Sequence, residues 1–402
     1  MKKLLSIALC AAMVLTCFAG CGNKGGSSES ANTIKIGVFE PTTGENGGGG
    51  KQEVLGIRYA NKVAPSVEIG GKKYDIKLVE VDNQSDKTAA VTAAQTLVSE
   101  KVIGVCGTYG SGCAIAAGQT FADAKIPAIG CSCTNPQVTL GNDYYFRVCF
   151  LDPFQGQVMA NFAYNTKSCK TAAVITQNGD DYSTGLGGYF KSAYQKLGGK
   201  VVAEKTYNTN EQDFNALLTD IKKQNPEVLF IPSSINTASL IIKQARDLGI
   251  KTPIMAGDTW QNATIIANAG KENCNDVYYS TFFSATDANV QDFVKGFKEY
   301  INSDKQNYTD NGNTDEIASV SALGYDTYMA FIEALKKVDG EVTGEKVQEV
   351  LKGIEFEGVT GKIAFDKNGD AAKDTAYIET FKDGAMQFVG YQGADGKFTA
   401  AK

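Results

Sequence analysis

Two groups of polar side chains stand directly after predicted strands, and their types suit the two ends of a zwitterion. In the first half, Ser111 begins a predicted helix, and Ser132 and Thr134 follow the next strand. Helix N-termini leave N–H groups unpaired and carry partial positive charge, so two that converge make a cradle for a carboxylate or phosphate. The same residues would serve as ordinary helix N-caps in any fold, and the sequence leaves both interpretations open.

The second half offers the opposite charge. Asp180, Asp181 and Tyr182 follow one predicted strand, and Asp258 follows another. A carboxylate at the end of a strand can pair with a ligand ammonium, although a solvated loop carboxylate is the commoner alternative. Because ligands bind outside the carboxyl ends of parallel strands, anion-binding residues in one half and carboxylates in the other favour an α-amino acid.

The glycine run at residues 47–50 does not form a nucleotide-binding motif. Glu45 stands where the first glycine of a phosphate-binding loop is required, and Gln52 stands where Ser or Thr would bind magnesium. We therefore interpret the run as a flexible loop between a strand and a helix, at the edge of a cleft.

Two sets of potential metal ligands are also incomplete. Asp366, Asn368 and Asp370 have the spacing of a calcium loop, but the glycine and the bidentate Glu that follow in such loops are missing. A β-turn between strands is the better prediction for this segment. Cys131 and Cys133 lie one residue apart in a strand without a third ligand nearby, so we expect no metal site and no cofactor.

The chain contains no histidine, which excludes Ser-His-Asp and Cys-His catalysis as well as histidine metal sites. We therefore expect no enzyme activity, with a carboxylate-based hydrolase using Asp180, Asp181 or Asp258 as the alternative. Seven cysteines lie beyond residue 21, an odd number without the spacing of a disulfide framework. Mostly free thiols are predicted.

The N-terminus has the features of an export signal. Lys2 and Lys3 are followed by an apolar run at residues 4–14, which is too short to cross a membrane, and by Ala19-Gly20-Cys21. This end resembles the lipobox of bacterial lipoproteins, in which the cysteine receives lipid. We predict a signal peptide at residues 1–20, lipidation of Cys21 and a flexible Gly/Ser-rich tether at residues 21–32.

Length and charge narrow the possibilities for the rest of the chain. About 380 residues exceed one ordinary hydrophobic core, so two domains are expected. Loss of Lys2 and Lys3 with the leader changes the net charge from −6 to −8. An acidic chain of this kind has no electrostatic footprint for nucleic acid.

Short β-branched segments alternate with amphipathic segments along the chain, and this pattern predicts parallel sheets covered by helices on both faces. In the first half the predicted strands are residues 34–38, 76–81, 102–106 and 126–130. The pattern restarts with strands at 172–176, 200–203, 228–232, 253–256 and 277–283. Three later helical segments precede strands at 362–365, 376–381 and 386–391, with Asp383-Gly384 as a hairpin turn. Two α/β lobes of similar architecture are therefore predicted.

An ordered set of short motifs resembles the leucine/isoleucine/valine-binding protein family, the type I receptors of ABC importers. The resemblance extends from Ile34 to about Tyr391. The motifs are Val81-Asp82-Asn83-Gln84-Ser85-Asp86, Gly107-x3-Ser111, Thr134-Asn135-Pro136, Phe146-Arg147 with Asp152-x2-Gln155-Gly156, Lys243-Gln244-Ala245-Arg246-x-Leu248-Gly249, and Gly257-Asp258 before Trp260.

The resemblance implies two doubly wound α/β lobes joined by three crossovers, with the ligand clamped between them. Lobe 1 would comprise residues 33–150 and 283–354, and lobe 2 residues 151–282 and 355–402. Ser111, Ser132 and Thr134 would hold an amino-acid carboxylate, Ser132 through its backbone. Tyr182 and Asp258 would meet the ammonium group.

Two aromatic residues usual in this family are absent. Gly48-Gly49-Gly50 replaces one of them and Ser233-Ser234 replaces the other, which alters the pocket for the ligand side chain. The resemblance therefore implies an amino-acid binder, with branched-chain amino acids as the first choice and another small polar or carboxylate solute as the alternative.

The same resemblance implies a monomeric receptor that delivers its ligand to a membrane permease. Lipid on Cys21 would hold it at the outer face of the cytoplasmic membrane. A regulator of the same fold is disfavoured, because the leader occupies the place of a DNA-binding segment.

Overall fold

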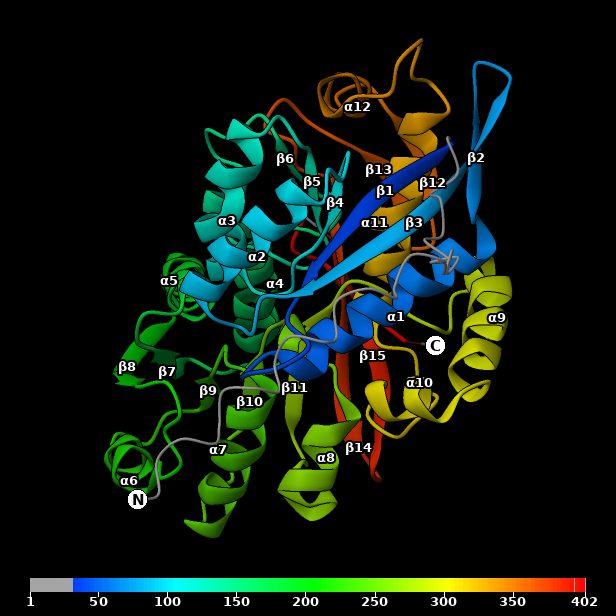
Figure 1. The fold of residues 1–402 in the computed structure, drawn as a ribbon. Coiled ribbons are helices and arrows are strands. Elements are labelled where there is room, and N and C mark those ends of the chain that lie inside the picture. The colour runs from blue at the N-terminus through cyan, green and yellow to red at the C-terminus, as the bar shows by residue number, and fades with distance from the viewer. Residues whose placement is uncertain (1–31, 394, 402) are drawn as a thin grey trace, which may run out of the picture.

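Two separate β-sheets, each flanked by helices, divide the chain into two lobes (Figure 1). The computed structural model describes residues 32–393 and 395–401. The predicted signal peptide, the lipidation site Cys21 and all but the last residue of the predicted tether lie outside the described residues. We use lobe 1 for the part built on the six-stranded sheet and lobe 2 for the part built on the eight-stranded sheet.

The sheet of lobe 1 has the strand order β2-β3-β1-β4-β5-β6. All neighbouring strands are parallel except the β2–β3 hairpin. Its strands are β1 (Thr33–Glu40), β2 (Ser66–Ile69), β3 (Lys72–Asp82), β4 (Val105–Cys106), β5 (Ala128–Gly130) and β6 (Tyr145–Arg147). The helices that follow these strands are α1 (Gly47–Val63), α2 (Lys87–Ser99) and α3 (Ser111–Asp123).

The sheet of lobe 2 has the order β16-β15-β14-β11-β10-β9-β7-β8, with a parallel part from β7 to β11 and an antiparallel part from β14 to β16. Its strands are β7 (Thr171–Gln177), β8 (Lys200–Tyr207), β9 (Val228–Phe230), β10 (Ile254–Ala256), β11 (Val277–Thr281), β14 (Thr375–Lys382), β15 (Ala385–Gly393) and β16 (Phe398–Ala400). The helices of this part are α4 (Asp152–Asn161), α5 (Asp181–Lys196), α6 (Asn215–Lys223), α7 (Ile235–Asp247) and α8 (Ala263–Ala269).

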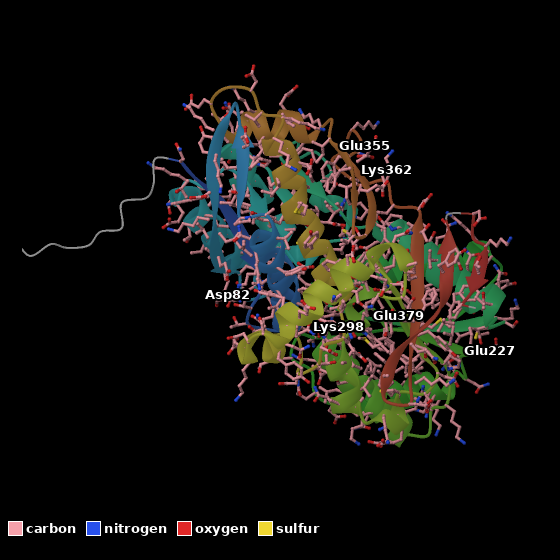
Figure 2. The ribbon with its side chains drawn as sticks, turned by 90° about the vertical axis from the view of Figure 1, so that its right-hand side faces the viewer. Asp82, Glu227, Lys298, Glu355, Lys362 and Glu379 are labelled. Atoms are coloured by element: carbon pink, nitrogen blue, oxygen red, sulfur yellow. The ribbon has the colours of Figure 1, made fainter. Side chains whose placement is uncertain are left out.

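The chain passes between the two sheets three times. It passes first between β6 and β7, and a second time after β11. This second passage leads into α9 (Gln291–Asn302), α10 (Lys305–Asp310), α11 (Ser319–Leu335) and α12 (Gly344–Leu351). The third follows a separate hairpin, β12 (Glu355–Gly358) and β13 (Gly361–Ala364), and enters β14. Figure 2 shows this hairpin with Glu355 and Lys362, which form an ion pair of 2.7 Å across its two strands.

α1 and α11 pack against each other in lobe 1 although more than 250 residues separate them in the sequence. Glycines allow the close approach. A Cβ at Gly56 would lie 1.9 Å from the carbonyl oxygen of Ser321, and a Cβ at Gly324 would lie 2.4 Å from that of Glu53. A larger residue at either position would force the helices apart.

Two of the hydrophobic cores lie within one lobe each, while another runs through both lobes, from Ile36 and Ile57 to Phe190 and Val228. Leu97, Val105 and Phe121 are fully buried among α2, α3 and the lobe 1 sheet, and Ile241 and Ile254 are fully buried in lobe 2. None of the helices in the described part of the chain is long and apolar enough to cross a membrane. The mixed α/β architecture predicted from the sequence is confirmed.

Candidate functional site

A small cavity lies between the lobes, where the carboxyl ends of several strands meet. Its volume is about 20 Å³. The residues around it are Asn46, Tyr109, Gly110, Ser111 and Ser132 from lobe 1 and Asp180, Tyr182, Ser234, Asp258 and Thr259 from lobe 2. The predicted ligand residues Ser111, Ser132, Tyr182 and Asp258 are thus together around one cavity, and Thr134 is not among the lining residues.

Ser111 is the first residue of α3, and the N-cap position before it belongs to Gly110. Gly110 has a φ of 101°, a conformation that favours glycine, and it has no side chain with which to cap the helix. The hydroxyl of Ser111 instead accepts a hydrogen bond of 3.1 Å from the backbone N–H of Asn135. Ser111 is therefore not the N-cap of α3, and the positive end of this helix is directed at the cavity.

Ser132 and Thr134 lie on the loop after β5 and are both buried. The hydroxyl of Ser132 donates a short hydrogen bond to Glu53 in α1. The hydroxyl of Thr134 has no hydrogen-bond partner within the described part of the chain, while its carbonyl accepts from the N–H of Asp152 at 3.0 Å. The side chain of Thr134 is thus buried with an unused hydrogen-bonding atom, but it is not among the residues that line the cavity.

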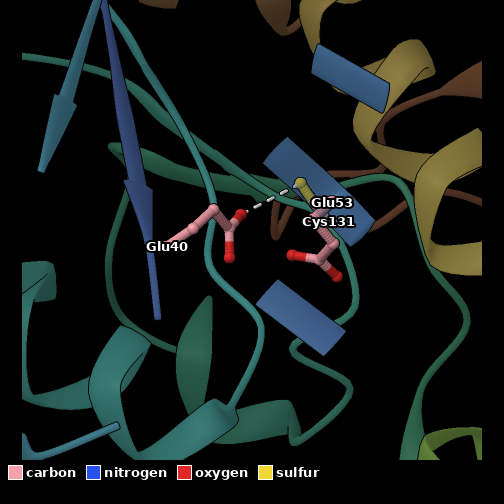
Figure 3. A group of neighbouring side chains, drawn as sticks. All are labelled: Glu40, Glu53 and Cys131. Carbon is pink, nitrogen blue, oxygen red and sulfur yellow. Dashed lines mark hydrogen bonds between the residues drawn. The ribbon is translucent and has the colours of Figure 1, made fainter. Parts of the chain in front are cut away.

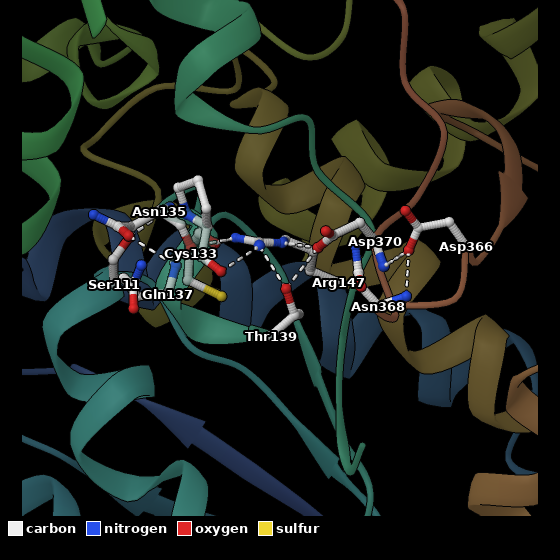
Figure 4. A network of polar contacts seen from close by, with 10 residues as sticks. Ser111, Cys133, Asn135, Gln137, Thr139, Arg147, Asp366, Asn368 and Asp370 are labelled. Carbon is white, nitrogen blue, oxygen red and sulfur yellow. Dashed lines mark hydrogen bonds and ion pairs between the residues drawn. The ribbon is translucent and has the colours of Figure 1, made fainter. Parts of the chain in front are cut away.

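Arg147 holds this loop in place (Figure 4). Its side chain is fully buried, and its Nη1 donates to the carbonyls of Cys133 and Asn135 at 2.7 and 2.6 Å. Its Nε forms an ion pair of 2.5 Å with Asp370, and its Nη2 donates to Thr139. Since the two carbonyls flank Thr134, the guanidinium fixes the backbone that carries the predicted ligand residues.

Asp370 belongs to the turn for which the sequence suggested a calcium loop or a β-turn. One oxygen of Asp366 accepts hydrogen bonds from the N–H groups of Asn368 and Asp370, and the N–H of Gly369 donates to the carbonyl of Asp366. The β-turn prediction is confirmed. The turn lies between β13 and β14, so Arg147 ties lobe 1 to the third crossover.

Asp258 is the buried carboxylate of lobe 2. It follows β10 at the start of a short 3₁₀ turn and is 2% exposed. Its Oδ1 accepts hydrogen bonds from Gln155 at 2.7 Å and from the hydroxyl of Tyr182 at 3.0 Å. Its Oδ2 is buried and finds no hydrogen-bond partner among residues 32–393 and 395–401. Burial raises the pKa of Asp258 from 3.8 to about 6, because removal from solvent disfavours the charged form of the carboxyl group.

The neighbouring acids Asp180 and Asp181 have different surroundings. Asp180 lines the cavity and caps α5, since its side chain accepts from the N–H of Tyr182. Burial raises its pKa to about 6. Asp181 is turned to Lys87 of lobe 1, with an Nζ–Oδ2 distance of 2.7 Å, and does not line the cavity.

Several polar contacts join the lobes around the cavity. Besides the Lys87–Asp181 ion pair, Asn135 donates to the carbonyl of Asp181 at 2.8 Å. Two further bonds connect Gln177 with Glu45 at 3.0 Å and Asn262 with Gln52 at 3.1 Å. The lobes are therefore closed on the cavity.

A pair of buried acids lies directly behind the lobe 1 wall (Figure 3). Glu40, at the end of β1, accepts hydrogen bonds from the N–H of Tyr109 at 2.7 Å and from the thiol of Cys131 at 3.5 Å. Glu53 accepts from Ser132 and has one oxygen without a further partner in the described structure. Burial raises the pKa of Glu40 from 4.5 to about 7, and burial with the charge of Glu40 raises the pKa of Glu53 as well.

Ligand atoms of Glu40, Glu53 and Cys131 all lie within 4.8 Å of one another, as a bound cation would require. One proton is sufficient to satisfy the same group. If Glu53 is protonated, it donates to Glu40, while Glu40 keeps its bonds from Tyr109 and Cys131. A proton shared by two carboxyl groups is also the usual result when like charges are buried together.

Among the lining residues, the sequence did not single out Asn46, Tyr109 and Thr259, whereas Ser234 belongs to the pair Ser233-Ser234 that the family resemblance placed at the ligand pocket. Each of the three lies in a loop after a strand, close to a motif that the sequence did single out. Tyr109 stands between Gly107 and Ser111, and Thr259 follows Asp258. Their position after strands was the available signal, but periodicity does not show which loop side chains turn inward.

Comparison with known proteins agrees with this architecture. The sequence profile of the family described as periplasmic binding protein matches residues 33–385. A relative from Pseudomonas aeruginosa, named leucine-, isoleucine-, valine-, threonine-, and alanine-binding protein, is 28% identical over 93% of this chain and 95% of its own length.

Two solved structures are similar over nearly the whole chain. The leucine-binding protein LivK from Thermotoga maritima has a TM-score of 0.82 and 32% identity, with 90% of this chain and 100% of that chain covered. LivJ from Streptococcus pneumoniae, in complex with isoleucine, has a TM-score of 0.77 and 29% identity, with 89% and 99% covered.

Proposed function

Because the chain belongs to the periplasmic binding protein family, we propose that it is the extracytoplasmic receptor of an ABC importer and binds an α-amino acid between its lobes. The observation that supports this most is Asp258. A buried carboxylate with one unpaired oxygen, facing a cavity between two lobes, is suited to pair with a cationic group of a ligand. An α-ammonium group has the required charge and up to three N–H donors.

The ligand carboxylate would bind on the lobe 1 side. Ser111 and Gly110 bring the N-terminus of α3 to the cavity, and this end favours a negative charge. Ser132 lies beside it and Thr134 follows on the same loop, so these residues remain the proposed carboxylate partners. Tyr182 already donates to Asp258 and would flank the ammonium. The two ends of one amino acid would thereby bridge the lobes.

Branched-chain amino acids are the first ligands to test, because the names of the similar proteins include leucine, isoleucine and valine. Mass spectrometry of the ligand released from the denatured protein would identify the solute directly. An unchanged amino acid supports the proposal. Turnover of an added solute would favour the alternative, a carboxylate-based hydrolase.

Ligand stabilisation provides a second test. A ligand at 100 times its dissociation constant contributes about 2.7 kcal/mol to the stability of the folded protein, which is easily detected as a shift in melting temperature. We expect amino acids to raise the melting temperature, and sugars and nucleotides to leave it unchanged. Stabilisation by sugars alone would contradict the proposal.

We also propose that lipid on Cys21 anchors the receptor and that a membrane permease accepts the released ligand. The support is the leader that ends in Ala19-Gly20-Cys21, followed by a Gly/Ser-rich segment. Cys21→Ser should move the protein from the membrane fraction to the soluble fraction. Incorporation of labelled fatty acid into this variant would show that the anchor is elsewhere.

A further inference from the structure

The ring of Tyr109 occupies the space next to the start of α1. Tyr109 is 3% exposed and lines the cavity. A Cβ at Gly49 would lie 2.3 Å from Cε2 of this ring, so any other residue at position 49 would displace it. Gly49 and Tyr109 are therefore a matched pair, in which the absent side chain of one makes room for the ring of the other.

This pair reduces the space for a ligand side chain. The closed cavity of about 20 Å³ corresponds to the space needed by roughly one water molecule. Even a small amino acid requires the lobes to part slightly, and every additional methylene requires a wider separation. Wider separation stretches the contacts that Asp181 makes with Lys87 and Asn135 across the lobes.

The chemistry of the wall also differs from that of an apolar pocket. Apart from the two tyrosines, the described side chains around the cavity are amides, hydroxyls and carboxylates, with no Val, Leu, Ile, Met or Phe among them. Asn46 contributes an amide from lobe 1, and Ser234 contributes a hydroxyl from lobe 2. Pockets that hold apolar groups are lined predominantly by apolar side chains, because polar groups that lose water need new hydrogen bonds. A leucine side chain would supply none, whereas a hydroxyl group would.

We propose that Tyr109, accommodated by Gly49, restricts the site to amino acids with small or hydroxylated side chains, namely glycine, alanine, serine and threonine. Leucine and isoleucine are excluded by size and by the polar wall. This inference rests on the proposed function and narrows its ligand class.

The first experiment is calorimetric titration of the full-length mature protein, dialysed free of ligand, with serine, threonine, alanine, valine, leucine and isoleucine. We expect the best of serine, threonine and alanine to bind at least 100-fold more tightly than leucine. A single methylene in a fitted pocket already changes affinity by about 10- to 200-fold.

Tyr109→Ala tests the residue itself. Removal of the ring should improve leucine binding relative to alanine by at least 10-fold, and Tyr109→Phe, which keeps the ring, is the matched control. Gly49→Ala should weaken the binding of threonine more than the binding of glycine, because the new methyl group pushes the Tyr109 ring into the cavity. In a Tyr109→Ala background the same change should have little effect, which a double-mutant cycle measures. Circular dichroism confirms that each variant is folded.

The outcomes separate the inference from the proposed function. Tighter binding of leucine than of alanine by the wild-type protein overturns the inference and leaves the amino-acid receptor intact. An unchanged leucine-to-alanine ratio in Tyr109→Ala also overturns it. Absence of binding for every amino acid, together with binding of another solute class, overturns the proposed function itself.

Discussion

The lobe 1 wall of the cavity presents hydroxyl groups and a helix N-terminus, whereas the lobe 2 wall presents the carboxylates of Asp180 and Asp258. Both lobes bury acids near the site, but they compensate for them differently. In lobe 1, burial raises the pKa of both Glu40 and Glu53, which favours one proton shared between them, and Arg147 pairs with Asp370. In lobe 2, Asp258 keeps one buried oxygen without a partner in the described structure.

This difference indicates how closure is coupled to the ligand. Near the site, the acids Glu40 and Glu53 of lobe 1 can be neutralised by one proton, and Arg147 is paired with Asp370, so neither arrangement needs a ligand. Lobe 2 carries a desolvated carboxylate whose partner comes only with the ligand. Burying such a charge without a partner is unfavourable, so closed lobes without ligand are penalised and closed lobes with ligand are favoured.

The largest effect on stability is expected when the buried ion pair between Arg147 and Asp370 is removed. Arg147→Met leaves Asp370 buried without its cation and frees the carbonyls on either side of Thr134. Removal of one partner of a buried ion pair typically costs about 3–5 kcal/mol in the free energy of unfolding. Urea denaturation measures this loss.

Arg246 in lobe 2 is the matched control. It also donates to backbone carbonyls, those of Ile250 and Thr252 at 2.8 and 2.9 Å, but it is only partly buried and the structure shows no ion pair for it in the described residues. Arg246→Met should lower the free energy of unfolding clearly less than Arg147→Met does. Equal losses would show that the buried ion pair of lobe 1 has no special importance.

The next largest effect concerns the unpaired acid of lobe 2. Asp258→Ala should weaken amino-acid binding by about 2–5 kcal/mol, or roughly 30- to several-thousand-fold, because the ligand ammonium would be buried without a partner. Asp258→Asn keeps the shape and should lose most of the affinity. Calorimetry measures both variants, with circular dichroism as the folding control.

Asp181→Ala is the matched control, because the Asp181 carboxylate faces Lys87 rather than the cavity. Its affinity should remain within a few-fold of the wild-type value. A folded Asp258→Ala protein that binds amino acids normally, together with an Asp181→Ala protein that does not, would contradict this assignment. Asp181, and not Asp258, would then be the partner of the ligand ammonium.

A pH titration sharpens the comparison. Since the pKa of Glu40 is raised from 4.5 to about 7 and that of Glu53 is also raised, the folded protein holds a proton that the unfolded chain releases. The contribution of this pair to stability is therefore fully present below about pH 4.5 and is lost as the pH rises through 7, by up to about 1.4 kcal/mol per pH unit for one proton. Glu53→Gln supplies a permanent N–H donor to Glu40 and should remove this part of the decline.

Burial also raises the pKa of other acids, which are Asp152, Asp180, Asp258, Glu316, Asp326 and Glu379. The informative quantity is therefore the difference in the pH profile of stability between the wild-type protein and Glu53→Gln. Glu40→Gln is the control, because it removes an oxygen that accepts from Tyr109 and should destabilise at every pH. Parallel profiles for the wild-type protein and Glu53→Gln would mean that the pair does not share a proton.

The smallest effect is expected at the contact between the lobes. The Lys87–Asp181 ion pair is half exposed, and such pairs contribute about 0.2–1 kcal/mol. Lys87→Ala should weaken ligand binding by less than about 5-fold, and the difference should shrink in high salt. Lys243→Ala breaks the exposed ion pair with Asp247 inside α7 and should leave ligand affinity unchanged.

The periodicity of the sequence was sufficient to predict most of the parallel strands and their covering helices. The strands it missed have weak signals. β2 (Ser66–Ile69) contains Ser and Glu, and it pairs with β3 through Gly70 and Gly71, whose positive φ angles are permitted by the absence of side chains. α5 begins at Asp181, and Asp180 is its N-cap. A residue that the sequence suggested as a ligand contact therefore also has a local structural role.

The candidate site was predicted in part. Ser111, Ser132, Tyr182 and Asp258 lie around one cavity, because strand ends on one edge of a parallel sheet converge. The acid pair of Glu40 and Glu53 was not predicted, since nothing local distinguishes a shared proton from two ordinary surface acids. Tyr109 was missed for a similar reason. Its position follows from the missing side chain of Gly49, 60 residues earlier in the chain.

The packing of α1 against α11 has a consequence for biosynthesis. The first large helix of lobe 1 closes its core against α11, Ser319–Leu335, a segment that is synthesised only after more than three quarters of the chain has been made. Lobe 2 is completed later still, when β14, β15 and β16 join its sheet. Contacts so distant in sequence form slowly and cannot form before their second partner exists. The nascent polypeptide therefore stays incompletely folded during most of its synthesis, which is the state that threading through a narrow translocation channel requires.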